Sequence, residues 1–374
     1  MKAKAHVTAV TAAFLTLRQR LAQRLEKNWS RKPLAALLAG FLMAVLAPTA
    51  ALAQHAVGSL YFLNRSDGSE AYGYIDKYGF FRQTFNGGIT AVAAPWIGAT
   101  HVVNSTNGLL IYNAGNGTAS VEQIKDNGLP SRGGSYNFSL GWTNIVSIGD
   151  HLFFYNSDGS AAIGYITPDR KFVGMASYPQ GSFLHWTHVI ATNNNLFFYN
   201  STDGSALVGY IYPSSGAFVQ TQSLPPGSLP TDFSYIVSDG NFLLLYNQQT
   251  GASMVGVIDS RPGQFQSRWS GSLPPGYNKL VRHDHYLLLY NSNSGGGTIG
   301  YIDRISAAKF IVTQQPAFSA GWTRIVSTND DLLFYNSITG SAAVGRIDRN
   351  GQFQQTPQVL SFSTGWFGVV ATTR

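Results

Sequence analysis

The feature that most limits the possible folds is a unit of roughly 45 residues that occurs seven times along the chain. An apolar residue followed by asparagine marks each copy, and successive asparagines are 49, 43, 44, 47, 44 and 45 residues apart. The marker asparagines are Asn64, Asn113, Asn156, Asn200, Asn247, Asn291 and Asn336. Two of the closest copies are GWTNIVSIGDHLFFYNSDGSAAIGYITPDRKF, from Gly141, and GWTRIVSTNDDLLFYNSITGSAAVGRIDRNGQF, from Gly321. A fixed period of this length is typical of repeat folds.

Each unit predicts four short β-strands, because runs of β-branched and aromatic residues alternate with turn residues. Strand one is WTxIVS, strand two is LLFYN, strand three is AAVGYID, and strand four begins at the phenylalanine of GQF or GAF. The turn between strands two and three carries a glycine, as tight turns with positive φ require. Four strands per unit and seven units predict an all-β chain folded as a seven-bladed β-propeller.

The two ends of the repeat region predict how the ring closes. The first unit begins directly at GSLYFLN and has no GWT strand, whereas the chain ends with an additional GWFGVVATTR. We therefore expect residues 366 to 372 to complete blade one. A ring closed in this way leaves no unpaired strand edge between the first blade and the last.

A glycine inside strand three recurs in six units, and such a glycine normally marks the close approach of another group. We expect that group to be the aromatic residue of strand one, for example Trp142 above Gly164. Unit two lacks both, since it has Glu122 at the glycine position and Ala99 at the aromatic position. The paired exchange supports a contact between the two positions.

Residues 1–53 are interpreted as an extended signal peptide, and residues 54–374 as the propeller. An uncharged apolar stretch over residues 34–47 follows basic residues and is short for a membrane span. Ala51 and Ala53 fit a signal peptidase site before Gln54. An uncleaved anchor is the alternative, and the long segment before the apolar stretch is equally consistent with a start codon placed too early. We expect a secreted or periplasmic protein without stable membrane insertion after cleavage.

The charge distribution argues against nucleic acid as a partner. The formal net charge is +7, but residues 1–53 hold eight of the 25 basic residues and one of the 18 acidic residues. The remaining chain is neutral and has no basic stripe, so a phosphate-binding surface would lack its main driving force. The chain contains no cysteine, so no disulfide stabilises the fold.

The repeat GWTxIVSxxxxLLFYNxxTGxAxVGxID resembles propeller repeats of exported bacterial proteins and, more loosely, the lectin-like propellers typified by tachylectin. The resemblance covers the whole chain after the signal peptide and implies the propeller architecture. It implies little about activity, because propellers include lectins, hydrolases, dehydrogenases and scaffolds. The closing tryptophan of quinone-dependent dehydrogenases is missing after Thr250 and Thr339, and the sialidase motif SxDxGxxW is absent.

The position after WT predicts a ligand site at the mouth of the central channel. Its occupants vary between units and are polar in six of seven: His101, Asn144, His188, Tyr235, Lys279 and Arg324, with Gly368 as the seventh. Different hydrogen-bonding groups at one level of a funnel are suited to a small polar ligand. The alternative is that these side chains only satisfy one another and water.

The seven marker asparagines, at the blade-edge turns, are a second candidate for ligand contact, and the alternative is that they cap those turns. Catalytic residues are not predicted, because Glu70 and Glu122 are the only glutamates after the signal peptide and no carboxylate pair is evident. His283, Asp284 and His285 form one dense cluster, which we interpret as a solvated loop rather than a metal site. No metal or cofactor is expected.

These observations favour an exported, non-enzymatic binding propeller that recognises a glycan or another polar surface ligand, through repeated weak contacts. The alternatives are a scaffold that binds an envelope protein and a hydrolase with its site at the channel mouth. We expect a monomer.

Overall fold

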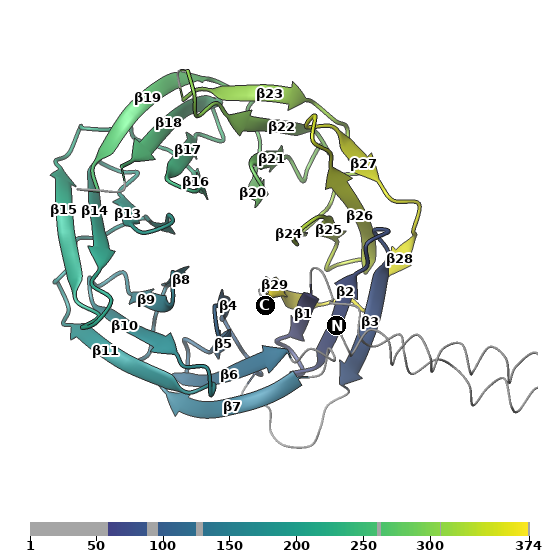
Figure 1. The fold of residues 1–374 in the computed structure, drawn as a ribbon, viewed down its shortest axis with the longest axis horizontal. Helices are drawn as coiled ribbons and strands as arrows, with labels where there is room; N and C mark the ends of the chain where they lie inside the picture. Colours follow the sequence, from purple (N-terminus) through teal and green to yellow (C-terminus); the bar gives the residue numbers. More distant parts are fainter. Residues whose placement is uncertain (1–58, 88–95, 125–129, 260–262, 307, 373–374) are drawn as a thin grey trace, which may run out of the picture. The chain divides into compact units, whose positions relative to one another are not determined.

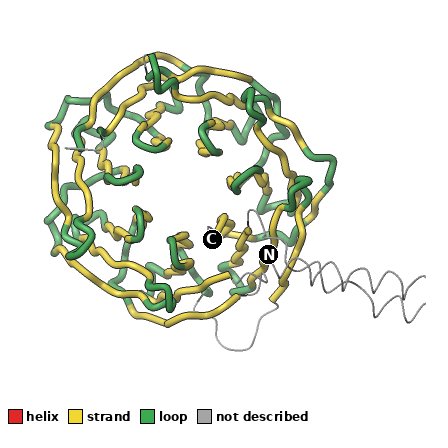
Figure 2. The backbone as a smooth tube through the Cα atoms, in the orientation of Figure 1, coloured by secondary structure: helices red, strands yellow, loops and turns green. Residues whose placement is uncertain are grey.

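The computed structural model describes residues 59–87, 96–124, 130–259, 263–306 and 308–372 (Figure 1). The signal peptide predicted for residues 1–53 lies outside the described residues. Seven antiparallel sheets surround a central axis, and the described residues form strands, turns and loops (Figure 2). The predicted seven-bladed β-propeller with four strands per blade is confirmed. None of the described residues forms a helix of the length and apolarity that crossing a membrane requires.

The strands of each blade follow one another in the chain, except in blade one. Blade one consists of β29 (Trp366–Thr372), β1 (Ser59–Asn64), β2 (Glu70–Ile75) and β3 (Phe81–Gly87). Blade two consists of β4 (His101–Ser105), β5 (Gly108–Tyr112), β6 (Thr118–Ile124) and β7 (Pro130–Asn137). Blade three consists of β8 (Asn144–Ile148), β9 (His151–Tyr155), β10 (Ala161–Ile166) and β11 (Phe172–Tyr178). Blade four consists of β12 (His188–Ala191), β13 (Leu196–Tyr199), β14 (Ala206–Ile211) and β15 (Phe218–Leu224).

The last three blades repeat the pattern, with one interruption. Blade five consists of β16 (Tyr235–Asp239), β17 (Phe242–Tyr246), β18 (Ala252–Ile258) and β19 (Phe265–Ser272). Blade six consists of β20 (Lys279–His283), β21 (Tyr286–Tyr290), β22 (Gly297–Ile302) and β23 (Phe310–Gln314). Blade seven consists of β24 (Arg324–Ser327), β25 (Leu332–Tyr335), β26 (Ser341–Ile347) and an outer strand in two pieces, β27 (Phe353–Gln355) and β28 (Leu360–Ser361), which both pair with β26.

The C-terminal strand closes the ring as predicted. β29 pairs antiparallel with β1, with Leu60 opposite Ala371 and Phe62 opposite Val369. The innermost strands β29, β4, β8, β12, β16, β20 and β24 each lie against the innermost strands of both neighbouring blades. They line the central axis (Figure 1). The first residues of these strands therefore lie together at one end of the axis.

The core lies where neighbouring blades pack against each other, and we call each of these contacts between two blades a seam. Strand two of each blade is buried on both faces, and every residue of β13 has an exposed fraction of 0%. The strand-one aromatics are also largely buried, with Trp142, Trp186 and Trp366 each 6% exposed. This explains why the strand-two sequences are continuously apolar rather than alternating.

The expected contact between the strand-three glycine and the strand-one aromatic is wrong. A Cβ atom on Gly164 would lie 2.3 Å from Cζ of Phe172, the first residue of β11, and a Cβ on Gly209 would lie 2.2 Å from Cζ of Phe218. The glycine makes room for the phenylalanine of the adjacent fourth strand. Trp142 packs instead on Phe154, with ring centroids 5.9 Å apart.

A tyrosine at the end of strand two joins consecutive blades. The hydroxyl of Tyr155 donates to the carbonyl of Leu184 at 2.8 Å and accepts from the amide of Trp186 at 2.7 Å. The same pair of hydrogen bonds occurs in six seams, from Tyr112, Tyr155, Tyr199, Tyr246, Tyr290 and Tyr335. Blade one carries Leu63 at this position.

Candidate functional site at the channel mouth

The structure gathers the predicted ring residues at one end of the inner strands. His101, Asn144, His188, Tyr235, Lys279 and Arg324 are the first residues of β4, β8, β12, β16, β20 and β24. All six are only partly buried. We call this set, together with neighbouring Arg65, the channel mouth.

Two histidines of the mouth are held by hydrogen bonds to the next blade. Nε2 of His101 lies 3.2 Å from the carbonyl oxygen of Thr143, and Nε2 of His188 lies 3.2 Å from that of Ser234. In both residues Nδ1 lies 2.9 Å from the hydroxyl of the preceding threonine. Burial lowers the pKa of both imidazoles below the usual 6.5. The neutral form, with Nε2 donating and Nδ1 accepting, satisfies both contacts.

Arg324 makes the same kind of link and stands beside two further cations. Its Nε donates to the carbonyl of Phe367 at 3.1 Å, and its guanidinium carbon lies 5.7 Å from the Phe367 ring centroid. Arg65 approaches the same ring, at 4.8 Å. Lys279 begins the inner strand of the neighbouring blade, and burial and the charge of Arg324 lower its pKa. Burial and Arg65 likewise lower the pKa of Arg324.

The mouth therefore has a cationic side, formed by Lys279, Arg324 and Arg65 on three consecutive blades. None of the ion pairs found among the described residues involves any of the three. The shared Phe367 ring is a favourable platform for guanidinium groups. Like charges that converge without a carboxylate favour binding of an anion.

The marker asparagines act within their own turns. Oδ1 of Asn200 accepts the amide of Thr202 at 2.9 Å, and Oδ1 of Asn336 accepts that of Ile338 at 2.9 Å. Equivalent bonds are made by Asn64, Asn113, Asn247 and Asn291. The side chain of Asn156 instead lies 3.5 Å from the hydroxyl of Ser157. Six of the seven marker asparagines thus cap their own turns, and their contact with a ligand stays a prediction.

The histidine cluster of blade six does not converge on one point. His283 is 3% exposed, and its Nδ1 lies 3.0 Å from Oγ of Ser327. Nδ1 of His285 pairs instead with the Asp284 carboxylate at 2.8 Å. The described part of the chain contains no group of three His, Cys, Asp or Glu side chains suited to a metal ion.

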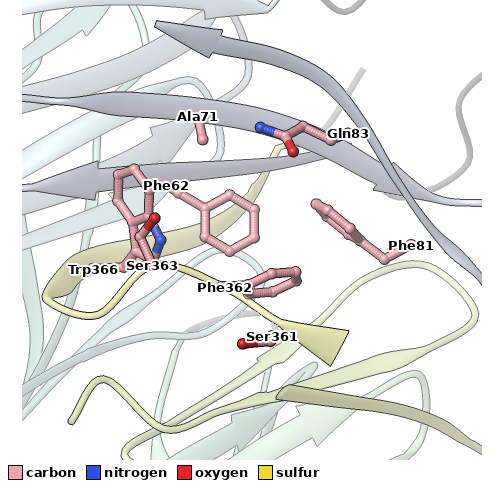
Figure 3. Close-up of a pocket in the computed structure, with 8 residues that line it drawn as sticks. All are labelled: Phe62, Ala71, Phe81, Gln83, Ser361, Phe362, Ser363 and Trp366. Carbon is pink, nitrogen blue, oxygen red and sulfur yellow. The ribbon is translucent and has the colours of Figure 1, made fainter. Parts of the chain in front are cut away.

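A small cavity of about 130 Å³ lies at the seam between blades seven and one (Figure 3). Its wall is formed by Phe62, Ala71, Phe81, Gln83, Ser361, Phe362, Ser363 and Trp366. The four aromatic rings approach one another, for example Phe81 and Phe362 with centroids 4.8 Å apart. This wall has no ionisable side chain, so it offers no acid, base or charge for catalysis.

Sequence reasoning missed a carboxylate pair. Glu70 and Glu122 lie in different blades, yet both approach Arg132: Nη2 is 3.9 Å from Oε2 of Glu70, and Nε is 3.7 Å from Oε1 of Glu122. Each glutamate stands where the other units carry alanine, serine or glycine. A glutamate at a position where the other units carry a small residue is the sequence signal from which the pair could have been predicted.

Comparison with solved structures places the fold among known propellers. A candidate 6-phosphogluconolactonase from Bacteroides uniformis aligns with a TM-score of 0.65 at 11% identity, over 85% of this chain and 100% of that chain. A candidate 6-phosphogluconolactonase from Bacteroides fragilis gives 0.62 at 14% identity, over 85% and 98%. The periplasmic gluconolactonase of Pseudomonas aeruginosa gives 0.58 at 17% identity, over 85% and 99%. No protein-family model and no curated protein matches the sequence.

Identities this low establish the fold alone. The predicted non-enzymatic, glycan-binding function is nevertheless corrected, because these similar propellers bear the names of lactonases rather than lectins. The expectation that the protein is not an enzyme receives no support, and neither does the lectin-like part of the resemblance. What the comparison does support is the seven-bladed propeller.

Proposed function

We propose that this protein is a hydrolase of cyclic esters that carry an anionic group, and that the substrate binds at the channel mouth. The names of the similar propellers support the reaction class. The observation that carries the proposal is the convergence of Lys279, Arg324 and Arg65, without an ion-pair partner among the described residues.

Ester hydrolysis needs a base and a group that stabilises the oxyanion. Water adds to the carbonyl carbon, the ring C–O bond breaks, and the product is a hydroxy acid. In this proposal the Arg324 guanidinium, fixed by its bond to Phe367, stabilises the oxyanion. Arg65 binds the anionic substituent.

Lys279 is the general base of this scheme. Burial and the charge of Arg324 lower the pKa of its ammonium group, which increases the fraction of neutral amine. The neutral amine accepts a proton from water and returns it to the ring oxygen that leaves. His101 and His188 have no role as acid or base in this scheme, since both ring nitrogens of each already have partners.

The test compares glucono-δ-lactone with its 6-phosphate in a pH-stat, with the uncatalysed rate subtracted. We expect faster hydrolysis of the phosphorylated lactone. Lys279→Arg keeps the positive charge but removes the base, because a guanidinium group stays protonated in proteins. It should lower kcat by about 10² to 10⁴ while KM changes little. Arg65→Met should raise KM for the phosphorylated lactone alone.

Lys309→Arg, at an exposed position on a strand-three to strand-four turn, is the matched control and should leave both constants unchanged. If neither lactone is hydrolysed faster than in buffer, the proposed activity is wrong. If both are hydrolysed equally by the wild type and by Lys279→Arg, the mouth is not the site of the reaction.

A further inference from the structure

The seam between blades one and two differs from the other six. It lacks the strand-two tyrosine, because Leu63 replaces it, and it lacks the strand-one aromatic, because Ala99 replaces it. Polar groups replace the apolar residues found elsewhere: Tyr61 stands where other units have Leu or Phe, and Tyr72 where they have Ile or Val. Together with the two glutamates, these changes occur in this seam alone within a sevenfold repeat. Because all of these replacements occur in one seam, we infer that the replaced residues act together.

The replaced residues form one connected network. Tyr61 on β1 donates to Oε1 of Glu70 at 3.0 Å, and Tyr72 on β2 donates to Oε2 of Glu122 on β6 at 3.3 Å. The rings of the two tyrosines lie 5.1 Å apart. The Arg132 guanidinium, from β7, lies between the carboxylates and 4.3 Å from the Trp96 ring centroid. These are the ionisable groups that face the two glutamates.

The network cannot accommodate two negative charges easily. Glu70 is 5% exposed and Glu122 is 1% exposed, so water does not screen them. Arg132 supplies one positive charge, at distances longer than a hydrogen bond. Oε1 of Glu122 is buried without a hydrogen-bond partner. Two carboxylates that share a single arginine leave one uncompensated negative charge, which is costly in a buried site.

We propose that the Glu70–Glu122 pair binds one proton between blades one and two, and that loss of this proton loosens this seam selectively. The proton neutralises the uncompensated charge and gives the pair a donor. Both tyrosines keep their protons, because burial raises the pKa of Tyr61 and of Tyr72. The seam thus contains a pH-sensitive pair of buried glutamates, which the other six seams lack.

The direction of the pH dependence follows from the glutamates. Burial, and next the Glu70 carboxylate, raise the pKa of Glu122 to about 8, and burial also raises that of Glu70. In the unfolded chain a glutamate ionises near its ordinary value of 4.5. The folded state therefore retains a proton that the unfolded state loses. Its stabilising contribution is complete below pH 4.5 and is lost as the pH rises towards about 8.

Thermal unfolding of the full chain between pH 6 and pH 9 tests the proposal. We expect the Tm of the wild type to fall as the pH rises, by several degrees. Glu122→Gln is uncharged and can still accept the Tyr72 hydrogen bond, so it should flatten this dependence and exceed the wild type in Tm at pH 9. Asp239→Asn is the matched control. It removes a fully buried carboxylate that Arg304 and Arg282 hold at 2.6 and 3.2 Å, and it should lower Tm without removing the pH dependence.

Hydrogen exchange at pH 9 locates the effect. Comparison of the wild type with Glu122→Gln at one pH cancels the chemical effect of base on exchange. Peptides covering β1, β5 and β6 should exchange faster in the wild type, whereas those covering β9 and β10 should not differ. Equal pH dependence of Tm in the wild type and Glu122→Gln, or accelerated exchange in every seam, would overturn the proposal. Neither measurement depends on the lactonase activity.

Discussion

At the scale of single residues, one tyrosine hydroxyl group links neighbouring blades in six of the seven seams. The strand-two tyrosine both donates to a loop carbonyl and accepts an amide of the next blade, and the amide would otherwise be buried without a partner. The ring of this tyrosine packs in the core, while its oxygen reaches the loop. The motif YN in the sequence therefore marks two functions: the tyrosine joins blades and the asparagine caps a turn.

Tyr246→Phe should weaken the seam between blades five and six. It removes the hydroxyl that donates to Pro274 at 2.8 Å and accepts from the Tyr277 amide at 3.1 Å. Because the buried amide of Tyr277 loses its partner, we expect a loss of about 1 to 3 kcal/mol in the free energy of unfolding. Urea denaturation measures this loss. Tyr212→Phe, at a side chain that is 50% exposed, is the control. Equal stability of the two variants would contradict the role of the hydroxyl.

At the scale of elements, the first and last strands depend on each other. β1 has β2 on one side and β29 on the other, and the closing pair brings residues 59 and 372 together. β29 also carries Trp366, which packs on Phe62 with ring centroids 5.9 Å apart. The closing strand thus contributes both backbone pairing and core packing to blade one.

Deletion of residues 365–374 should therefore leave β1 as an exposed edge. An unpaired, apolar edge strand is a template for association with other chains. We expect aggregation or a non-cooperative melting transition, measured by size-exclusion chromatography and calorimetry. Deletion of residues 373–374 alone keeps β29 and serves as the control. A monomer with unchanged Tm after the longer deletion would show that closure through β29 contributes little.

At the scale of the whole molecule, buried ionisable groups limit stability on both sides of neutrality. In our proposal, deprotonation of the Glu70–Glu122 pair lowers stability on the alkaline side. On the acidic side, His101 and His188 have pKa values lowered by burial. A histidine whose folded pKa is lower contributes stability above its unfolded value, 6.5, and this stability is lost as the pH falls below that value.

The double variant His101→Gln with His188→Gln should consequently lose less Tm, or gain more, than the wild type when the pH is lowered from 6.5 to 5. Glutamine can still donate to the carbonyls of Thr143 and Ser234 but does not take up a proton. Differential scanning calorimetry at half-unit pH steps measures the slope. A slope identical to that of the wild type would mean that other groups cause the acidic loss.

Much of the architecture was predictable from the sequence, because repetition supplies the same local evidence seven times. The strand runs, the glycine turns and the extra strand at the C-terminus each specify pairing between neighbours in the chain. The ring positions from His101 to Arg324 were predictable for the same reason, since equivalent residues in equivalent strands must share one level of the channel. The approach of Arg65 to this ring of residues was not predictable, because Arg65 lies in a turn outside the repeated position.

Only the tertiary structure determined which side chains pack against each other in the seams. Packing between strands of different blades depends on the angle and distance between sheets, which periodicity does not specify. The sequence alone suggested Trp142 as the partner of Gly164, whereas Phe172 on the adjacent strand occupies that space. Glu70 and Glu122 are separated by 52 positions in the chain, and only the stacking of blade two on blade one brings both to Arg132. The sequence by itself thus determined the blade, its copy number and its closure, and the stacking of blades determined which side chains meet.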